Sequence, residues 1–341
     1  MIIFRADGNA EVGLGHVMRC LSIADEVKRN GDTCIFVISD EAAKTLIEAR
    51  GFETVILGSR FDDMESEIDS FINIVKQRMP SAVVIDSYYV TLNYLQAISN
   101  KVKTVYIDDI NAFEYPVDLL VNYNIYAEDF NYKRYLAPPA LALGCEFAPL
   151  RKEFRDSGKD SVSGPVKKML ILSGGADPLH ATVRIISKVL ESEMGQQFEY
   201  HVVSGAVNCN RAELRLLTAK NHRVILHENV TTMAELMSGC DLAISAGGST
   251  LYELCACGIP AISYSFVDNQ LPGVAKFAQL GIIEYAGDLR NDEEQVLENI
   301  ALWLTKMIES EEKRYAASER MRRIVDGMGA KRIVNRIAKL C

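Results

Sequence analysis

A chain of 341 residues is long enough for about two domains, each with its own hydrophobic core. Hydrophobic residues make up 48% of it and charged residues 24%, as in an ordinary soluble globular protein. The formal net charge of -9 argues against nucleic acid or an anionic membrane as the main partner, although it leaves room for a local basic pocket that binds phosphate.

The N-terminal half alternates between apolar runs and helical patterns. Residues 1–6 predict a buried strand, and a glycine loop and a helix over 16–29 follow it. A helical pattern also covers residues 62–78. Further strands are expected at 33–38, 81–86, 103–107 and 117–121. Near-continuous apolar strands between helices are typical of a parallel sheet that is covered on both faces.

A polar stretch over residues 151–167 interrupts this rhythm and is expected to link two domains, 1–150 and 168–341. The alternation then restarts, with helices over 179–193 and 249–257. Strands are expected at 168–173, 198–203, 223–227, 241–245 and 260–264. From about residue 292 the pattern predicts two or three amphipathic terminal helices. Two doubly wound α/β domains are therefore expected, with ligands between them at the carboxyl ends of the strands.

Targeting segments and metal motifs are not apparent. The N-terminal apolar run is too short for a signal peptide, and no stretch approaches the ~20 apolar residues of a membrane helix. The eight cysteines form no C-x-x-C pair, and most lie in apolar runs, which predicts reduced thiols in a cytoplasmic protein. Cys255 and Cys257 have no second Cys/His pair nearby, so no metal site is predicted there.

A glycine loop after the first strand places a histidine at the start of a helix. Gly13 and Gly15 let the backbone turn tightly, and the helix start offers free N–H groups to an anion. His16 and Arg19 are three residues apart and so share one helix face. A plainer interpretation stays open, in which His16 bonds a nearby carbonyl and Arg19 is a solvated charge.

Two loops of the second half resemble phosphate-binding turns. One holds Gly174 and Gly175, followed by a helix cap at Asp177 and Pro178. The other holds Gly248, Ser249, Thr250 and, one turn later, Glu253, whose carboxylate could accept hydrogen bonds from ribose hydroxyls. An ordinary strand-to-helix loop and a surface carboxylate remain the alternatives.

Polar clusters also follow two other strands. Asp86 and Tyr88 end one strand of the first half, and Asn269 and Gln270 follow residues 260–264. Side-chain amides both donate and accept, which suits sugar hydroxyls and N-acetyl groups. Ordinary loop residues are the alternative.

The ordered set of motifs resembles one family along nearly the whole chain. FRADGNAEVGLGHVMRCLSIADE looks like the opening of the UDP-2,4-diacetamido-2,4,6-trideoxy-β-L-altropyranose hydrolases of pseudaminic acid biosynthesis. VVIDSYY, YIDD, ILSGGADP, GGSTLYEL and DNQ look like the later motifs of that family. The second half is also similar to the GT-B transferase that adds N-acetylglucosamine to the lipid-linked peptidoglycan precursor.

The resemblance implies a GT-B fold with a central cleft, no cofactor and no metal. It implies UDP and a UDP-activated diacetamido sugar as partners, and hydrolysis of the anomeric C–O bond with inversion. We expect a monomer that binds neither nucleic acid nor membrane. His16 is expected to be the general base, since a neutral imidazole can accept the proton of the attacking water. The expected sugar contacts are Gly13, Gly15, Arg19, Asp86, Tyr88, Asn269 and Gln270, with Asp86 in reserve to orient the imidazole or the water. The expected nucleotide contacts are Gly174, Gly175, Val230, Gly248, Ser249, Thr250 and Glu253.

Two other functions remain open. A glycosyltransferase would use the same donor and need an acceptor groove, and no exposed apolar or basic run for a lipid-linked acceptor is evident. A non-catalytic nucleotide-sugar sensor would keep the second-half loops without needing His16.

Overall fold

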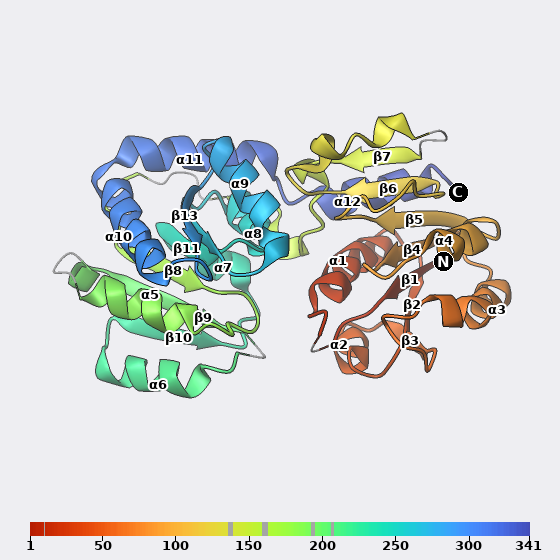
Figure 1. Ribbon diagram of the computed structural model, residues 1–341, viewed down its shortest axis with the longest axis horizontal. Coiled ribbons are helices and arrows are strands. Elements are labelled where there is room, and N and C mark those ends of the chain that lie inside the picture. The colour runs from red at the N-terminus through yellow and green to blue at the C-terminus, as the bar shows by residue number, and fades with distance from the viewer. Residues whose placement is uncertain (10, 136–138, 159–162, 192–194, 206–207) are drawn as a thin grey trace. The chain divides into compact units, whose positions relative to one another are not determined.

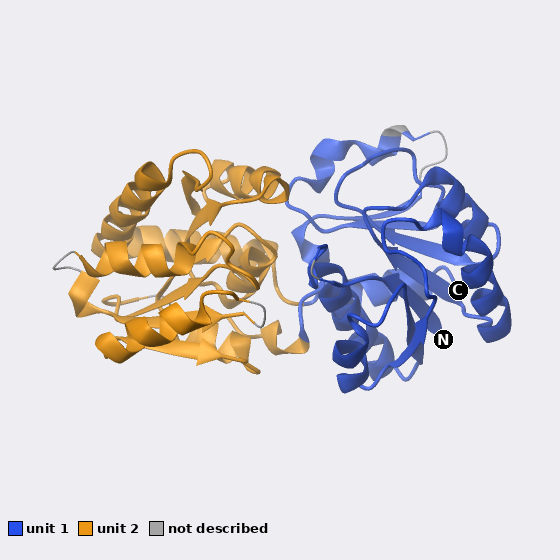
Figure 2. Ribbon diagram, turned by 60° about the horizontal axis from the view of Figure 1, so that its bottom comes forward, with its two compact units in different colours: residues 1–151, 328–341 blue, residues 152–327 orange. Residues whose placement is uncertain are grey.

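The computed structural model of the chain describes residues 1–9, 11–135, 139–158, 163–191, 195–205 and 208–341. Its contacts divide it into two compact units, shown in Figure 2. Unit 1 comprises Met1–Arg151 and Met328–Cys341, and unit 2 comprises Lys152–Gly327.

Unit 1 is built on a seven-stranded parallel sheet. Its strands are β1 (Ile2–Ala6), β2 (Cys34–Ile38), β3 (Glu53–Ile56), β4 (Ala82–Asp86), β5 (Lys103–Ile107), β6 (Leu119–Asn122) and β7 (Ala140–Leu143). Its helices are α1 (Gly15–Arg29), α2 (Lys44–Ala49), α3 (Ile68–Arg78), α4 (Leu92–Ser99) and α12 (Gly329–Ala338). Short 3₁₀ turns are η1 (Glu65–Glu67), η2 (Ala127–Phe130), η3 (Tyr132–Arg134) and η4 (Cys145–Phe147).

The strand order of this sheet is β3-β2-β1-β4-β5-β6-β7. The order reverses at β1, which pairs in parallel with β2 on one side and with β4 on the other. In that pairing Ala6 lies opposite Asp86, so both strands end at the same level. A crevice outside the carboxyl ends of such a pair is where open α/β sheets bind ligands.

Unit 2 repeats the same design. Its strands are β8 (Lys168–Leu172), β9 (Glu199–Ser204), β10 (Val224–Glu228), β11 (Leu242–Ala246), β12 (Ala261–Ser265) and β13 (Glu284–Asp288). Its helices are α5 (Ala181–Leu190), α6 (Arg211–Lys220), α7 (Met233–Ser238), α8 (Thr250–Cys257), α9 (Leu271–Gln279), α10 (Glu293–Glu309) and α11 (Glu311–Ile324), with 3₁₀ turns η5 (Lys152–Phe154), η6 (Gly195–Gln197) and η7 (Asp268–Gln270). The order β10-β9-β8-β11-β12-β13 reverses between β8 and β11.

The central strands are buried on both faces, which explains their unbroken apolar runs. All five residues of β1, β2, β4, β11 and β12 are buried. In unit 1, Phe71 of α3 and Tyr94 of α4 pack with Ile3 and Val83 in one core. On the ribbon of Figure 1, α1 and α12 lie side by side against the sheet. Both units therefore have cores of their own.

The expected alternation is confirmed, with three strands that the sequence patterns did not predict. β3, β7 and β13 are absent from the expected set, and each is short and only partly buried. All three are edge strands. Edge strands bury less surface, and these three lack the apolar run by which the fourth edge strand, β10, was expected at 223–227.

The last helix departs from the expected grouping of residues 168–341, because α12 packs on unit 1. Ile333 and Ile337 of α12 are buried, and the Arg332 guanidinium donates to the Glu146 carbonyl at 2.9 Å. A Cβ at Gly329 would lie 2.1 Å from the carbonyl oxygen of Ala148, so glycine permits this close approach.

The expected linker 151–167 is mostly structure of unit 2. η5 contacts α7 and α8, and Phe154 is fully buried. The Ser238 hydroxyl also donates to the Ser157 carbonyl at 2.7 Å. Residues 159–162 lie outside the described residues. A polar composition here reflects hydrogen bonding on the surface of a domain rather than a free connection.

Candidate functional site

The point where the first sheet reverses its order brings the histidine of the glycine loop to a buried aspartate. His16 is the second residue of α1, which follows β1, and Asp86 is the last residue of the neighbouring β4. Seventy residues separate them in the sequence, yet His16 Nδ1 lies 2.6 Å from Asp86 Oδ1. The alternative in which His16 merely bonds a nearby carbonyl is not what the structure shows.

This contact selects the tautomer of the imidazole. Asp86 is ionised and can only accept, so the hydrogen must sit on Nδ1 of His16. In the neutral ring Nε2 then carries the lone pair, and Nε2 has no hydrogen-bond partner within the part of the chain that the structure describes. The His16 side chain is 8% exposed and borders a small pocket. A carboxylate that holds one ring nitrogen is the geometry that orients an imidazole.

Arg19 is buried in the same cluster instead of being solvated. Its Nε and one terminal nitrogen donate to both oxygens of Asp86, each at 2.5 Å. The other terminal nitrogen donates to Asp109 at 2.8 Å and to the Tyr123 hydroxyl at 3.0 Å. Burial alone would raise the pKa of Asp86, but the Arg19 charge and the hydrogen bonds of Arg19 and His16 hold it well below its usual range. Arg19 thus positions Asp86, and its donors are occupied by protein groups.

Tyr88 packs edge-on against His16, with ring centroids 4.6 Å apart. Its hydroxyl donates to Asp109 at 3.1 Å, and 38% of the residue is exposed. Burial, together with the Asp109 charge, raises the pKa of the Tyr88 hydroxyl, so it stays a neutral donor. The pocket beside these rings is lined by Asp7, Val12, His16, Phe61, Asp86, Ser87, Tyr88 and Tyr89. Exposed aromatic rims above polar groups suit a sugar ring.

The two glycines of this loop differ in what they contribute. Gly13 has a φ of 73°, which favours glycine, and its N–H donates to the Asn9 carbonyl at 2.9 Å. A Cβ on Gly15 would meet nothing within 4 Å. The first turn of α1 has no side-chain cap, so its N–H groups and positive dipole end are available to an anion.

The second sheet brings the two glycine loops of unit 2 to its own reversal point. The loop with Gly174 and Gly175 follows β8, and Gly248 and Ser249 follow the adjacent β11. Gly174 has a φ of 75°. Asp177 caps α5, because its carboxylate accepts the N–H groups of Ala181 and Thr182 at 2.8 and 3.1 Å.

The helix that follows β11 starts without a side-chain cap. Thr250 is the first residue of α8, and Ser249 before it makes no capping hydrogen bond. Glu253 lies one turn later and is half-buried. The N–H groups of Gly247 and Gly248 donate to the Tyr264 and Ala246 carbonyls at 2.8 and 2.9 Å, so an anion at this loop would meet the N–H groups at the start of α8.

The remaining predicted residues of unit 2 lie in neighbouring loops. Val230 follows β10 and is half-buried, and Asn269 in η7 after β12 is exposed. The Gln270 Oε1 accepts the Phe266 N–H at 3.0 Å, which ties this side chain to its own loop.

Asp7 was not singled out by the sequence reasoning. It follows β1 directly, and its side chain is 8% exposed. One oxygen accepts the Ser39 N–H at 2.7 Å and the other accepts from Arg5 at 2.6 Å. The signal was present, since the carboxyl end of the strand before a glycine loop is a ligand position.

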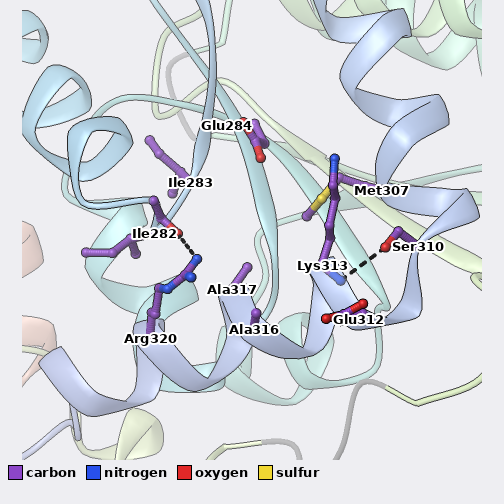
Figure 3. A pocket seen from close by; sticks show the side chains of 11 residues that line it. Ile282, Ile283, Glu284, Met307, Ser310, Glu312, Lys313, Ala316, Ala317 and Arg320 are labelled. Atoms are coloured by element: carbon purple, nitrogen blue, oxygen red, sulfur yellow. Dashed lines mark hydrogen bonds between the residues drawn. The ribbon is translucent and has the colours of Figure 1, made fainter.

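A larger pocket, with a volume of about 400 Å³, lies elsewhere in unit 2 (Figure 3). Its lining comes from the start of β13 and from α10 and α11, and its long charged side chains are Glu284, Glu312, Lys313 and Arg320. Arg320 is engaged with the Gly281 carbonyl at 2.8 Å. Because this pocket adjoins the amino end of β13, it is at the opposite end of the sheet from the glycine loops.

Metal clusters and membrane helices are both absent from the described ranges. No group of three or more His, Cys, Asp or Glu side chains could hold a metal ion. No described helix has the length and apolar character to cross a membrane.

Comparison with known proteins finds relatives throughout the chain. Residues 169–335 match the glycosyltransferase family 28 C-terminal domain. An uncharacterized protein of Methanocaldococcus jannaschii is 28% identical over 75% of this chain, which spans only 54% of that protein. A spore coat polysaccharide biosynthesis protein of Bacillus subtilis is 23% identical, covering 96% of this chain and 95% of its own. The UDP-2,4-diacetamido-2,4,6-trideoxy-β-L-altropyranose hydrolase of Campylobacter jejuni is 24% identical, covering 83% of this chain and 98% of its own.

Solved structures show the fold. MurG from Acinetobacter baumannii superimposes with a TM-score of 0.70 at 14% identity, over 99% of both chains. The UDP-GlcNAc 2-epimerase of Neisseria meningitidis gives 0.67 at 14% identity, over 99% of this chain and 100% of its own. The fold is GT-B, with two Rossmann-like α/β domains, as expected. The relatives and the matched domain point to an enzyme that acts on nucleotide sugars.

Proposed function

We propose that this protein hydrolyses UDP-2,4-diacetamido-2,4,6-trideoxy-β-L-altropyranose to UDP and the free sugar, a step of pseudaminic acid biosynthesis. The observation that carries the proposal is the Asp86–His16 pair, in which a carboxylate holds Nδ1 of a histidine that lines a small pocket. The Campylobacter jejuni hydrolase supports the choice of substrate, because its match covers 98% of that protein.

The reaction needs one base and a stabilised leaving group. A water molecule attacks the anomeric carbon from the side opposite UDP, and a new C–O bond forms as the bond to the phosphate oxygen breaks. His16 Nε2 takes the proton of that water, and Asp86 stabilises the imidazolium that results. The sugar leaves with inverted configuration, and the proton passes from His16 to solvent.

The leaving UDP is assigned to unit 2. The loop at Gly174–Gly175 and the uncapped start of α8 at Ser249–Thr250 are the proposed source of N–H groups and a helix dipole for the pyrophosphate, with Gly248 as a close backbone contact, which lowers the need for a protein acid. Glu253 is the proposed acceptor for the ribose hydroxyls, and the loop with Val230 is proposed to flank the uracil. Tyr88, Asn269 and Gln270 are proposed sugar contacts.

A GT-B glycosyltransferase that uses a UDP-amino sugar is the second candidate. The match of residues 169–335 to the glycosyltransferase family 28 C-terminal domain favours it. A non-catalytic sensor of nucleotide sugars is the third. The three candidates differ in whether UDP is released without an acceptor.

The deciding experiment incubates the pure protein with the UDP-diacetamido sugar and with UDP-N-acetylglucosamine, and follows UDP release without added acceptor. A hydrolase releases one UDP per free sugar, and proton NMR in the first seconds shows the inverted anomer. UDP release only after addition of an acceptor would establish a transferase. Binding without any release would establish a sensor.

A further inference from the structure

A second carboxylate borders the pocket that His16 lines. Asp7 lies at the end of β1 and lines the same pocket as His16. Asp86, the other carboxylate of the lining, is fully buried and accepts hydrogen bonds from His16 and Arg19 on both oxygens. Asp7 is therefore the carboxylate of this lining with acceptor sites to spare.

The hydrogen bonds of Asp7 leave half of its capacity unused. An ionised carboxylate accepts about four hydrogen bonds. Asp7 accepts one from the Ser39 N–H and one from Arg5, at 2.7 and 2.6 Å. Within the described part of the chain these are its partners, so two acceptor sites remain on a side chain that borders the pocket.

A buried network holds this carboxylate in place. Arg5 is fully buried, and two of its nitrogens donate to Glu67 at 2.6 and 2.9 Å while the third donates to Asp7. Glu67 also accepts from the Tyr94 hydroxyl at 3.0 Å. Asp7 consequently has a fixed position and a permanent cation beside it, and Arg5 keeps a partner in Glu67 if the charge of Asp7 is removed.

The pocket has the size of a single water molecule. Its volume is about 10 Å³, at the lower limit of the roughly 10–15 Å³ that one water occupies. A bound water needs two to four polar partners. His16 Nε2 and Asp7 supply two acceptors, and the Ser87 hydroxyl, which accepts the Tyr89 N–H at 3.1 Å, has its own hydrogen left to donate.

We propose that Asp7 and His16 together hold the attacking water. His16 Nε2 accepts the hydrogen that leaves during attack, and Asp7 accepts the other hydrogen and so aims the oxygen lone pair at the anomeric carbon. The inference rests on the proposed hydrolysis. It adds Asp7 to the residues that take part in the reaction. A pocket that holds one water molecule also favours hydrolysis over transfer to a larger acceptor molecule.

Two substitutions of Asp7 separate this role from a structural one. Asp7→Asn keeps the shape and an acceptor for Ser39 but loses the charge and the acceptor for Arg5, and it should lower kcat about 10–100-fold, as misplacement of a reactant does. Asp7→Glu keeps the charge beside Arg5 but pushes the carboxylate into the water-sized space, and it should also lose turnover. A residue needed only to pair with Arg5 would be rescued by glutamate.

Tyr94→Phe is the matched control, because it removes a hydroxyl from the same network away from the pocket. The measurements are kcat, KM, the Kd for UDP and the melting temperature, beside His16→Asn. The expected result is low kcat for both Asp7 variants, with KM and UDP affinity within the range of Tyr94→Phe; Asp7→Asn also lowers the melting temperature, because it breaks the buried pair with Arg5, but the protein stays folded at the assay temperature. Turnover within twofold of wild type in either Asp7 variant overturns the inference while His16 keeps its role. A wild-type protein that releases no UDP removes the proposed function and this inference with it.

Discussion

Asp86 Oδ1 accepts the Nδ1–H of His16 at 2.6 Å. The two residues are brought together by the pairing of β1 with β4, which lie some eighty residues apart in the sequence. The contact sets the tautomer, holds the ring and leaves Nε2 as the basic atom. Arg19 donates two hydrogen bonds to the same carboxylate. A base, its orienting carboxylate and a fixed counter-charge therefore form one rigid group at the end of β4.

Replacement of His16 by asparagine should abolish most turnover without unfolding the protein. We expect kcat to fall about 10²–10⁴-fold, the usual scale for loss of a general base. UDP affinity should stay unchanged, because the proposed nucleotide contacts lie in unit 2. UDP release and titration calorimetry measure the two quantities. Near wild-type turnover in a folded His16→Asn protein would remove His16 from the mechanism.

Substitution of Asp86 by asparagine should destabilise the fold at neutral pH, and the loss should become smaller as the pH falls. The folded pKa of Asp86 is depressed, so its ionised form stabilises the fold above the unfolded pKa of ~3.9, and this contribution is lost as pH falls through the folded value. The wild-type protein should have a free energy of unfolding about 3 kcal/mol higher than Asp86→Asn, the usual cost of breaking a buried ion pair. This difference should be constant above about pH 5 and shrink toward pH 2. Urea unfolding at a series of pH values measures it. An advantage that grows on acidification would contradict the ion-pair account.

Removal of the Glu253 side chain should weaken nucleotide binding. A hydrogen bond to a charged group contributes about 1.5–3 kcal/mol, so Glu253→Ala should raise the Kd for UDP about 10–100-fold. Glu298→Ala on the exposed face of α10 is the control, and it should leave the Kd unchanged. Calorimetry with UDP makes the comparison. Equal affinity in the Glu253→Ala protein would show that the ribose lies elsewhere.

A methyl group at Gly329 should loosen the docking of α12. The new Cβ would lie 2.1 Å from the Ala148 carbonyl oxygen, so the helix must shift at a cost of about 1–3 kcal/mol and several degrees in Tm. Gly273→Ala in α9 is the matched control, because its Cβ meets nothing within 4 Å. That variant should be neutral or up to about 1 kcal/mol more stable. Scanning calorimetry distinguishes the two, and an unchanged Tm for Gly329→Ala would mean that α12 is free to move.

The central strands and the helix starts could be read from the residues alone. Buried parallel strands need unbroken apolar runs, and the turns after them need glycine, so local chemistry marks 1–6, 81–86 and the loop at Gly13. The same reasoning placed His16 at the start of a helix and named Asp86 as its reserve partner. β3, β7 and β13 escaped it, because these three edge strands bury too little to carry a clear pattern.

What only the tertiary structure decided is which distant residues meet. The pairing of β1 with β4 puts Asp86 against His16 and buries Arg19, whose charge on its own would suggest a solvated side chain. The pairing of β1 with β2 places the N–H of Ser39 on Asp7, and η1 delivers Glu67 to Arg5. The physical reason is that local residue patterns specify strands and turns, whereas the order of the strands depends on how the whole core is buried. That order decides which charged residues lie next to one another.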